Sequence, residues 1–394
     1  MADEPIAELG GRTPLEVASH PNMDRIATDG VMGLGVTVPE HLPAGSDIAN
    51  LSVIGVDPAQ CYTGRSPLEA VSMGITLGEK DVTYRCNLVT LSDEQALSDR
   101  SMIDYSAGEI SSEEAAQLIA VMQSRFGSDK IEFHPGVSYR HCLVLRDGET
   151  GARLTPPHDL SGQTLGEAHL PQGANRDLLL ELMAYSTEAF RDHPVNLARI
   201  AQGKNPATSA WFWGEGTRPK LNNFQQQYGL RGGMISAVDL LQGIGLSMGM
   251  KVIPVEGATG NYHTNFKGKG EAAVKALRED CDFLYIHVEA PDECGHQAQL
   301  KEKIWSIEQI DSQIIGPVMA ALKESGEDWV VMVAPDHPTP IALKTHTRTP
   351  IPFAYCRKGQ QGAAPRIYNE KAAQATGVFV PKAHELLGRM LAGH

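Results

Sequence analysis

Long apolar runs are absent from this sequence of 394 residues. No run approaches the roughly 20 consecutive apolar residues that a membrane-spanning helix requires. Residues 1–5 are acidic and lack the apolar stretch of a signal peptide. The sequence therefore predicts a soluble protein.

Paired cysteines and basic stripes are absent as well. The six cysteines are scattered singly and form no Cys-x-x-Cys pair, which argues against a zinc ribbon and is typical of a protein from a reducing cytoplasm. A formal net charge of -14 and an aromatic content of only 6% argue against nucleic acid or an anionic membrane as a partner. A small phosphorylated substrate remains compatible, because metal ions or local arginines can reverse the field within one cleft.

The C-terminal half alternates short apolar segments with segments of helical periodicity. Strands are predicted at 251–256, 283–288 and 329–334, and helices at 234–249, 270–279 and 300–324. Buried strands that alternate with helices indicate a largely parallel sheet covered on both faces.

Residues 76–172 have a different pattern of apolar and polar residues. Alternating segments at 82–86 and 139–144, one helix near 112–126 and polar turns predict an inserted α+β domain. The predicted fold class is α/β, with a core formed by residues 1–75 and 173–394 and the insertion at 76–172.

Metal-type ligands follow the last two predicted strands. Asp292 and His296 come after the first of these strands, and Asp336, His337 and His346 come after the second. Ligands bind at the carboxyl edge of open parallel sheets, so we expect these side chains to converge. One such pair alone is more often part of a turn. Two pairs without a thiolate favour a catalytic site for zinc, manganese or iron.

Ser46 is the candidate nucleophile. It follows Gly45 and precedes a predicted helix, a position that also suits a simple helix N-cap. In the catalytic interpretation, a metal ligand lowers the pKa of the hydroxyl, and the helix N-terminus favours an incoming phosphate.

Nine short motifs occur in order along nearly the whole chain. They are Gly11-Arg-Thr-Pro-Leu-Glu-Val-Ala18, Pro21-Asn-Met-Asp24, Gly45-Ser46-Asp47, Tyr62-Thr-Gly-Arg-Ser-Pro-Leu-Glu-Ala70, Arg85-Cys-Asn87, His193-Pro-Val-Asn196, Gly257-Ala-Thr-Gly260, Asp292-Glu-Cys-Gly-His296 and Asp336-His337 with His346. The ordered set resembles the archaeal-type cofactor-independent phosphoglycerate mutases of the alkaline-phosphatase superfamily.

The resemblance implies an alkaline-phosphatase-like core with an inserted domain, a phosphoserine intermediate and two divalent metal ions. The metals would be manganese or zinc, with magnesium as the alternative. One would be held by Asp292, His296 and His346, and the other by Ser46, Asp336 and His337. The substrate phosphate and carboxylate would be bound by Arg85, Asn87, Arg140, Arg199 and Lys204, for each of which a solvated surface role is the alternative.

Four features depart from the family pattern. Members usually begin with an apolar strand that ends in Asp-Gly, ahead of a segment like Met1-Ala2-Asp3. That strand and its metal-ligating Asp are not in this sequence, so we expect the natural chain to be longer by one strand. The alternative is that Asp3 replaces the missing ligand. Asn50 stands where many members have His. Asp104-Tyr-Ser-Ala-Gly108 and Trp213-Gly-Glu-Gly216 replace segments that carry arginine, which removes positive charge.

The leading hypothesis is interconversion of 3-phosphoglycerate and 2-phosphoglycerate through phospho-Ser46, with the insertion as a lid that excludes water. The departures are similar to a bacterial branch proposed to phosphorylate homoserine, so phosphotransfer to another small hydroxyl compound is the main alternative. A phosphatase or phosphonate hydrolase and a metal-binding homologue without turnover are the others. The sequence leaves the oligomeric state open and does not rank the possible general bases, which are His141, His158, His193, His263 and His287.

Overall fold

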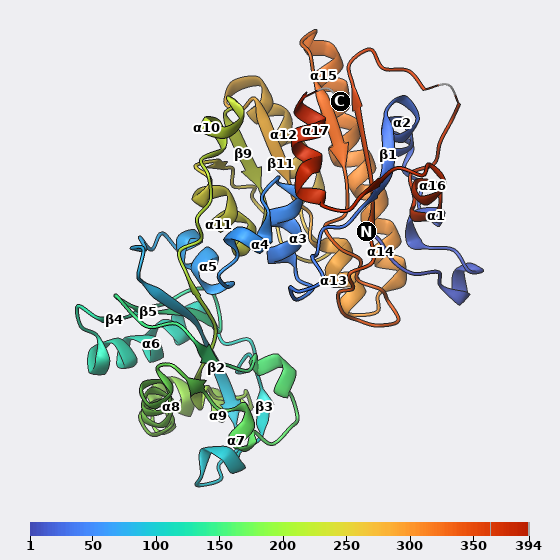
Figure 1. Cartoon of the computed structure of the whole chain (residues 1–394). Helices are drawn as coiled ribbons and strands as arrows, with labels where there is room; N and C mark the ends of the chain where they lie inside the picture. Colours follow the sequence, from blue (N-terminus) through green and yellow to red (C-terminus); the bar gives the residue numbers. More distant parts are fainter. Residues whose placement is uncertain (363, 393–394) are drawn as a thin grey trace. The chain divides into compact units, whose positions relative to one another are not determined.

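The computed structural model describes residues 1–362 and 364–392, and the chain divides into two compact units (Figure 1). Unit 1 comprises Met1–Tyr62 and the described residues from Lys220 onward. Unit 2 is the single stretch Thr63–Pro219. None of the described helices is both long and apolar enough to cross a membrane.

Unit 2 is wider than the predicted insertion at 76–172. Strand β8 (Ser209–Thr217) pairs antiparallel with β2 (Val82–Leu91), and helix α8 (Arg176–Arg191) packs against β8. Helix α5 (Ser66–Ser72) also contacts β2. The segments on either side of the predicted insertion therefore complete its sheet and core instead of belonging to unit 1.

Unit 1 contains two sheets with helices packed against them. Its strands are β10 (Lys251–Val252), β9 (Gly232–Ile235) and β11 (Phe283–Ile286) in one sheet, and β12 (Val330–Val333), β13 (Ile351–Arg357), β1 (Val31–Gly35) and β14 (Phe379–Val380) in the other, each in spatial order. All pairings in the first sheet are parallel, as is β1 with β14. Strand β13 runs antiparallel to both neighbours, because the link at 334–350 has no helix that could cross over the sheet.

Strands β11 and β12 are less buried than their apolar composition predicts. Most of their side chains are only partly buried. The physical reason is the pairing: among the described strands, β11 pairs only with β9 and β12 only with β13, so each has one unpaired edge.

Two predicted helices of unit 1 differ in their bounds. The helix expected from residue 234 begins later, as α11 (Asp239–Ser247), because Ile235 belongs to β9. The long helix expected at 300–324 is divided into α14 (Leu300–Gln309), a π-helical segment (Ile310–Ile315) and α15 (Gly316–Ser325). The remaining main helices of unit 1 are α1 (Pro14–Val17), α2 (Pro21–Asp29), α3 (Ser46–Val53), α4 (Pro58–Cys61), α10 (Phe224–Tyr228), α12 (Phe266–Glu279), α13 (Ala290–His296), α16 (Glu370–Ala375) and α17 (Leu386–Ala392).

Unit 2 is built on an antiparallel sheet. Its strands run in the order β3 (Met102–Asp104), β2, β5 (Arg140–Leu145) and β4 (Ile131–His134), with β8 also paired to β2, and its helices include α6 (Ser112–Phe126), α7 (Gly166–His169), α8 and α9 (Pro194–Ala201). Strands β6 (Ala152–Arg153) and β7 (Gln172–Gly173) form a separate pair.

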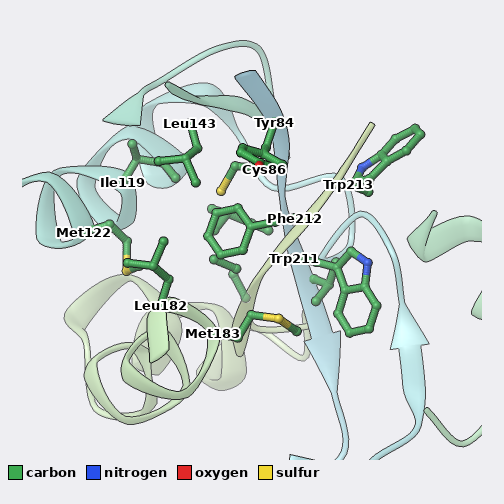
Figure 2. Close-up of a cluster of buried hydrophobic side chains, with 14 of the residues drawn as sticks. Tyr84, Cys86, Ile119, Met122, Leu143, Leu182, Met183, Trp211, Phe212 and Trp213 are labelled. Carbon is green, nitrogen blue, oxygen red and sulfur yellow. The ribbon is translucent and has the colours of Figure 1, made fainter. Parts of the chain in front are cut away.

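Part of the core of unit 2 packs against one face of this sheet. Figure 2 shows Phe212 pointing from β8 into a cluster with Met122 of α6 and Leu182 of α8. Trp211 and Trp213 point to the other side of the strand, as alternation along a β-strand requires. The opposite face of the sheet therefore carries a different set of side chains.

Candidate metal and nucleophile site

The predicted ligands Asp292, His296 and His346 converge in unit 1. Helix α13 follows β11 and places Asp292 and His296 on one face, because they are four residues apart. His296 Nε2 lies 3.3 Å from Asp292 Oδ2 and 2.9 Å from His346 Nε2, and His346 Nε2 lies 3.4 Å from Asp292 Oδ1. One ligand atom from each residue lies within 4.8 Å of the others, a set able to hold a metal ion.

The surroundings of the two histidines fit a metal ion. His296 Nδ1 lies 2.9 Å from the carbonyl oxygen of Lys344, and His346 Nδ1 lies 3.4 Å from that of Ala44. A carbonyl only accepts, so each Nδ1 carries the proton and each Nε2 presents a lone pair. Two such lone pairs 2.9 Å apart beside a carboxylate require a positive charge.

Protons can supply that charge when no metal is bound. The hydrogen bond with Asp292 raises the pKa of His296 to about 9. Burial opposes ionisation of Asp292, but hydrogen bonds from His296 and His346 hold its pKa well below the usual value. A divalent cation would compete with these protons for the same atoms.

The second predicted set adjoins the first. Ser46 is the first residue of α3, and its Oγ lies 3.0 Å from His337 Nε2. That nitrogen lies 3.3 Å from Asp336 Oδ2, and His337 Nδ1 lies 3.9 Å from Asp292 Oδ1. The N-cap position belongs to Gly45, so the hydroxyl of Ser46 is not used as a cap.

Asn50 connects this site to the sheet. Its amide nitrogen donates to Asp336 Oδ2 and to the carbonyl oxygen of Ser46, both at 2.8 Å, while its Oδ1 accepts from the Tyr285 hydroxyl at 2.7 Å. The sequence marked Asn50 only as a departure and missed Tyr285. The one available signal was a tyrosine within an apolar strand, whose buried hydroxyl needs a partner.

We expect Asn50→Leu to weaken manganese binding about 10- to 100-fold, because Asp336 loses the donor that orients its carboxylate. Tyr285→Phe should cause a smaller loss, since the amide of Asn50 remains. Manganese titration by calorimetry measures both, with the melting temperature as a control for folding. Unchanged affinity in Asn50→Leu would contradict the orienting role.

Asp3 does not join the metal-type ligands. Lys303 Nζ donates to Asp3 Oδ2 at 2.7 Å and to the carbonyl oxygen of Thr339 at 2.8 Å. Both charged side chains are almost fully buried. Asp3 therefore forms an internal ion pair with Lys303, and Lys303 also binds the loop that follows His337 through the carbonyl oxygen of Thr339.

Three of the predicted substrate-binding residues lie together in unit 2. Arg85 and Asn87 are on β2, and Arg140 is the cross-strand partner of Asn87 on β5. Arg85 Nε lies 2.7 Å from Glu69 Oε2.

Arg199 and Lys204 do not belong to this group. The guanidinium of Arg199 is buried and donates to Glu114 at 2.7 Å and to the carbonyl oxygens of Asn205 and Ala107. The proposed substrate role of Arg199 is corrected accordingly, because these internal bonds occupy the guanidinium. Lys204 is exposed on the surface after α9.

The structure separates the histidines that the sequence could not rank. His193 caps α9, with its Nδ1 accepting from Val195 N. His287 lies between Ser236 Oγ at 3.0 Å and Glu289 Oε2 at 3.1 Å. His263 is exposed, and His158 packs edge-on against Trp213.

His141 is unsuited to act as a base near neutral pH. Burial, and secondarily Arg140, lowers the pKa of His141 to about 3, and its Nδ1 accepts from Gly136 N. Below about pH 6.5 the unfolded chain therefore binds a proton that the folded protein does not.

We accordingly expect this histidine to make the protein acid-sensitive. Its contribution to the free energy of unfolding should fall as the pH drops from about 6.5 towards 3, by up to about 1.4 kcal/mol per pH unit. Urea unfolding of the wild type and His141→Gln at pH 7, 6 and 5 measures the difference, and the variant should lose less stability. Equal losses would show that His141 is not the cause.

The two segments that depart from the family pattern by lacking arginine, residues 104–108 and 213–216, each contain a carboxylate that accepts hydrogen bonds within unit 2. Glu215 accepts from the Tyr84 hydroxyl at 2.8 Å and from Gly151 N at 2.7 Å. Asp104 accepts from Ser106 N and Gly108 N, closing the turn after β3. Both carboxylates therefore organise unit 2 internally.

The α/β core and the ligands gathered after β11 and β12 define an alkaline-phosphatase-like protein with a metal-type site. Residues 27–196 match the family described as 2,3-bisphosphoglycerate-independent phosphoglycerate mutase. A probable mutase of this name from Geobacter sulfurreducens is 48% identical over 392 residues, covering 99% of this chain and 97% of the relative. One from Methanosarcina barkeri is 46% identical over 391 residues, covering 98% and 96%.

Solved structures agree with the fold. The PH0037 protein from Pyrococcus horikoshii matches with a TM-score of 0.80 and 28% identity, covering 100% of this chain and 94% of that one. A cofactor-independent phosphoglycerate mutase from Thermoplasma acidophilum matches with a TM-score of 0.62 and 21% identity, covering 99% and 96%. The chain belongs to the 2,3-bisphosphoglycerate-independent phosphoglycerate mutase family.

Proposed function

We propose that this protein interconverts 3-phosphoglycerate and 2-phosphoglycerate through a phosphoserine at Ser46. The observation that carries the proposal is the position of the Ser46 hydroxyl, at the start of α3 and 3.0 Å from His337 in a cluster of metal-type ligands. In the first step, Ser46 Oγ loses its proton and bonds to the phosphorus of the substrate, while the P–O bond to glycerate breaks and the departing oxygen takes up a proton. In the second, the other hydroxyl of glycerate loses its proton and bonds to the phosphorus, while the bond from phosphorus to Ser46 Oγ breaks and Oγ takes up a proton.

The residues around Ser46 suit this transfer. The N-terminus of α3 favours the negative charge that builds up on Oγ and on the phosphoryl oxygens. Asn50 holds the first turn of α3 against Asp336. His337, next to Oγ, fixes the orientation of the hydroxyl.

Two divalent metal ions complete the proposed site. They are manganese or zinc, with magnesium as the alternative, held by Asp292, His296 and His346 and by Ser46, Asp336 and His337. When bound, they would lower the pKa of the Ser46 hydroxyl and neutralise phosphoryl charge. Asp292 lies between the two sets, since it contacts His296 and His346 of its own set and its Oδ1 is 3.9 Å from Nδ1 of His337 in the other.

Arg85, Asn87 and Arg140 are the proposed ligands for the phosphate or carboxylate of the substrate. They are neighbours across β2 and β5, and guanidinium groups bind both anions through two parallel hydrogen bonds. The six cysteines are unpaired and buried, in keeping with the proposed place of action, the cytoplasm.

The test is an enolase-coupled assay of the manganese-loaded protein with 3-phosphoglycerate. We expect steady turnover without added 2,3-bisphosphoglycerate and without release of free phosphate. Absence of turnover in the folded, loaded protein would refute the mutase proposal. Phosphate release would indicate a phosphatase instead, and phosphorylation of homoserine would indicate the other phosphotransferase.

A further inference from the structure

Arg85 in unit 2 is a buried cation whose forked end has no partner within the described chain. Its side chain is only 9% exposed, and its Nε is paired with Glu69 Oε2 at 2.7 Å. Neither terminal nitrogen of Arg85 donates a hydrogen bond to an acceptor within the described residues. The two terminal nitrogens are therefore the donors of this guanidinium that remain for a ligand or for water.

The charges around Arg85 favour an anion at that end. Burial, followed by the nearby guanidinium groups of Arg65 and Arg140, lowers the pKa of Arg85 to about 10, and Glu69 is the carboxylate that opposes them. Three cations thus share one carboxylate. The phosphate or carboxylate of a substrate would supply the missing negative charge.

Trp213 covers the face of this guanidinium. The two residues are cross-strand partners on β2 and β8, and Arg85 Cζ lies 4.2 Å from the centre of the indole ring. Figure 2 shows that Trp213 points to the side of β8 opposite Phe212, which is the side on which it meets Arg85.

The indole ring is itself held in place. Its Nε1 donates to Asn87 Oδ1 at 3.0 Å, and the ring of His158 packs against it edge-on, with centroids 5.3 Å apart. Asn87 is only 2% exposed and Trp213 only 7%. The ring therefore forms a rigid wall against which Arg85 lies flat.

We infer that Trp213 is a positioning residue, which fixes the plane of the Arg85 guanidinium so that its two terminal nitrogens bind one anionic group of the substrate. The inference rests on the proposed function. Glu69 fixes the guanidinium at Nε and Trp213 fixes its plane, which leaves only the forked end for a ligand. An arginine held in this way loses little side-chain entropy when it binds an anion.

The inference gives a physical meaning to one departure from the family pattern. Where resembling mutases carry an arginine-containing segment, this chain has Trp213. A second cation so close to Arg85 would repel it, whereas an aromatic face attracts it. At this position the chain therefore lacks a positive charge beside Arg85, and has in its place an aromatic ring that orients the Arg85 guanidinium.

The test compares Trp213→Leu, which removes the aromatic face, with Trp213→Phe, which retains one. Trp211→Phe is the matched control, because Trp211 is on the same side of β8 but donates to the carbonyl oxygen of Thr155. We expect Trp213→Leu to raise both KM and the Kd for 3-phosphoglycerate about tenfold with kcat within about twofold. Trp213→Phe should recover most of the loss, and the control should match the wild type. Calorimetry supplies Kd independently of turnover.

A second pair of variants separates positioning from general packing. In an Arg85→Lys background, where no planar fork exists, Trp213→Leu should cause little further loss of binding. If Trp213→Leu is poorly folded, Trp213→Met replaces it in both backgrounds.

The outcomes are distinguishable from failure of the proposed function. Wild-type turnover with unchanged KM and Kd in Trp213→Leu would overturn the inference alone, as would an undiminished loss in the Arg85→Lys background. A wild type that binds 3-phosphoglycerate without converting it, together with tenfold weaker binding by Trp213→Leu, would refute the mutase proposal and leave the inference standing.

Discussion

Replacing Ser46 with alanine is expected to lower kcat at least about 1,000-fold, because the hydroxyl is the proposed acceptor of the phosphoryl group. No described neighbour offers a second hydroxyl at the same place: Thr339, next to His337, is already engaged with Asp292. The enolase-coupled assay measures the loss. Incubation with labelled phosphoglycerate followed by rapid denaturation should leave label on the wild type and none on Ser46→Ala.

Ser52→Ala is the matched control for this variant. Ser52 is a buried serine of the same helix, and its hydroxyl donates to the carbonyl oxygen of Thr37. Its removal should cost about 1 kcal/mol of stability and leave kcat nearly unchanged. If Ser46→Ala kept wild-type activity, the covalent mechanism would be wrong.

Removing the Asp292 carboxylate charge is expected to have the second largest effect. Asp292 lies within 3.4 Å of the ring nitrogens of both His296 and His346, so Asp292→Asn should disturb that metal position most directly. We expect manganese affinity to fall at least about 100-fold, and kcat/KM to fall with it. Treatment of the wild type with a chelator should abolish turnover, and added manganese should restore it.

Glu293→Gln provides the comparison for Asp292→Asn. It removes a neighbouring carboxylate on α13 that bonds to Gln297, outside the ligand cluster. Manganese titration of both variants decides the matter. Equal affinities in Asp292→Asn and the wild type would remove Asp292 from the proposed ligand set.

Much of the candidate site could be anticipated because its residues follow strands. Polar residues directly after β11 and β12 were expected at one edge of a parallel sheet. The two strands lie in different sheets, but the structure does bring Asp292, Asp336 and the three histidines together. The expected parallel arrangement was wrong for β12, which pairs antiparallel with β13, a strand that the sequence analysis did not predict. The direction of β13 depends on whether the preceding link contains a crossover helix, and the link at 334–350 contains none.

Other errors came from partners far apart in the sequence. The β8 strand belongs to unit 2 because it pairs with β2, a contact that local periodicity does not encode. Arg199 was predicted to bind substrate from the family resemblance, and the sequence did not show that Glu114, 85 residues away, accepts a hydrogen bond from its guanidinium. Composition also did not show which strands have an unpaired edge. It predicted full burial for β11 and β12, which are only partly buried.

The order of the two units along the chain has a consequence for synthesis on the ribosome. Unit 2 is one continuous stretch, so all of its strand partners have been made once Pro219 has been added. Strand β1, just before Ser46, pairs with β13 and β14, which come more than 300 residues later. Ser46 is thus synthesised early, whereas the strands that pair with β1 and the ligands near Ser46 are synthesised only when the chain is nearly complete. An unpaired apolar strand of this kind is where a nascent chain is most open to misfolding and to chaperone binding.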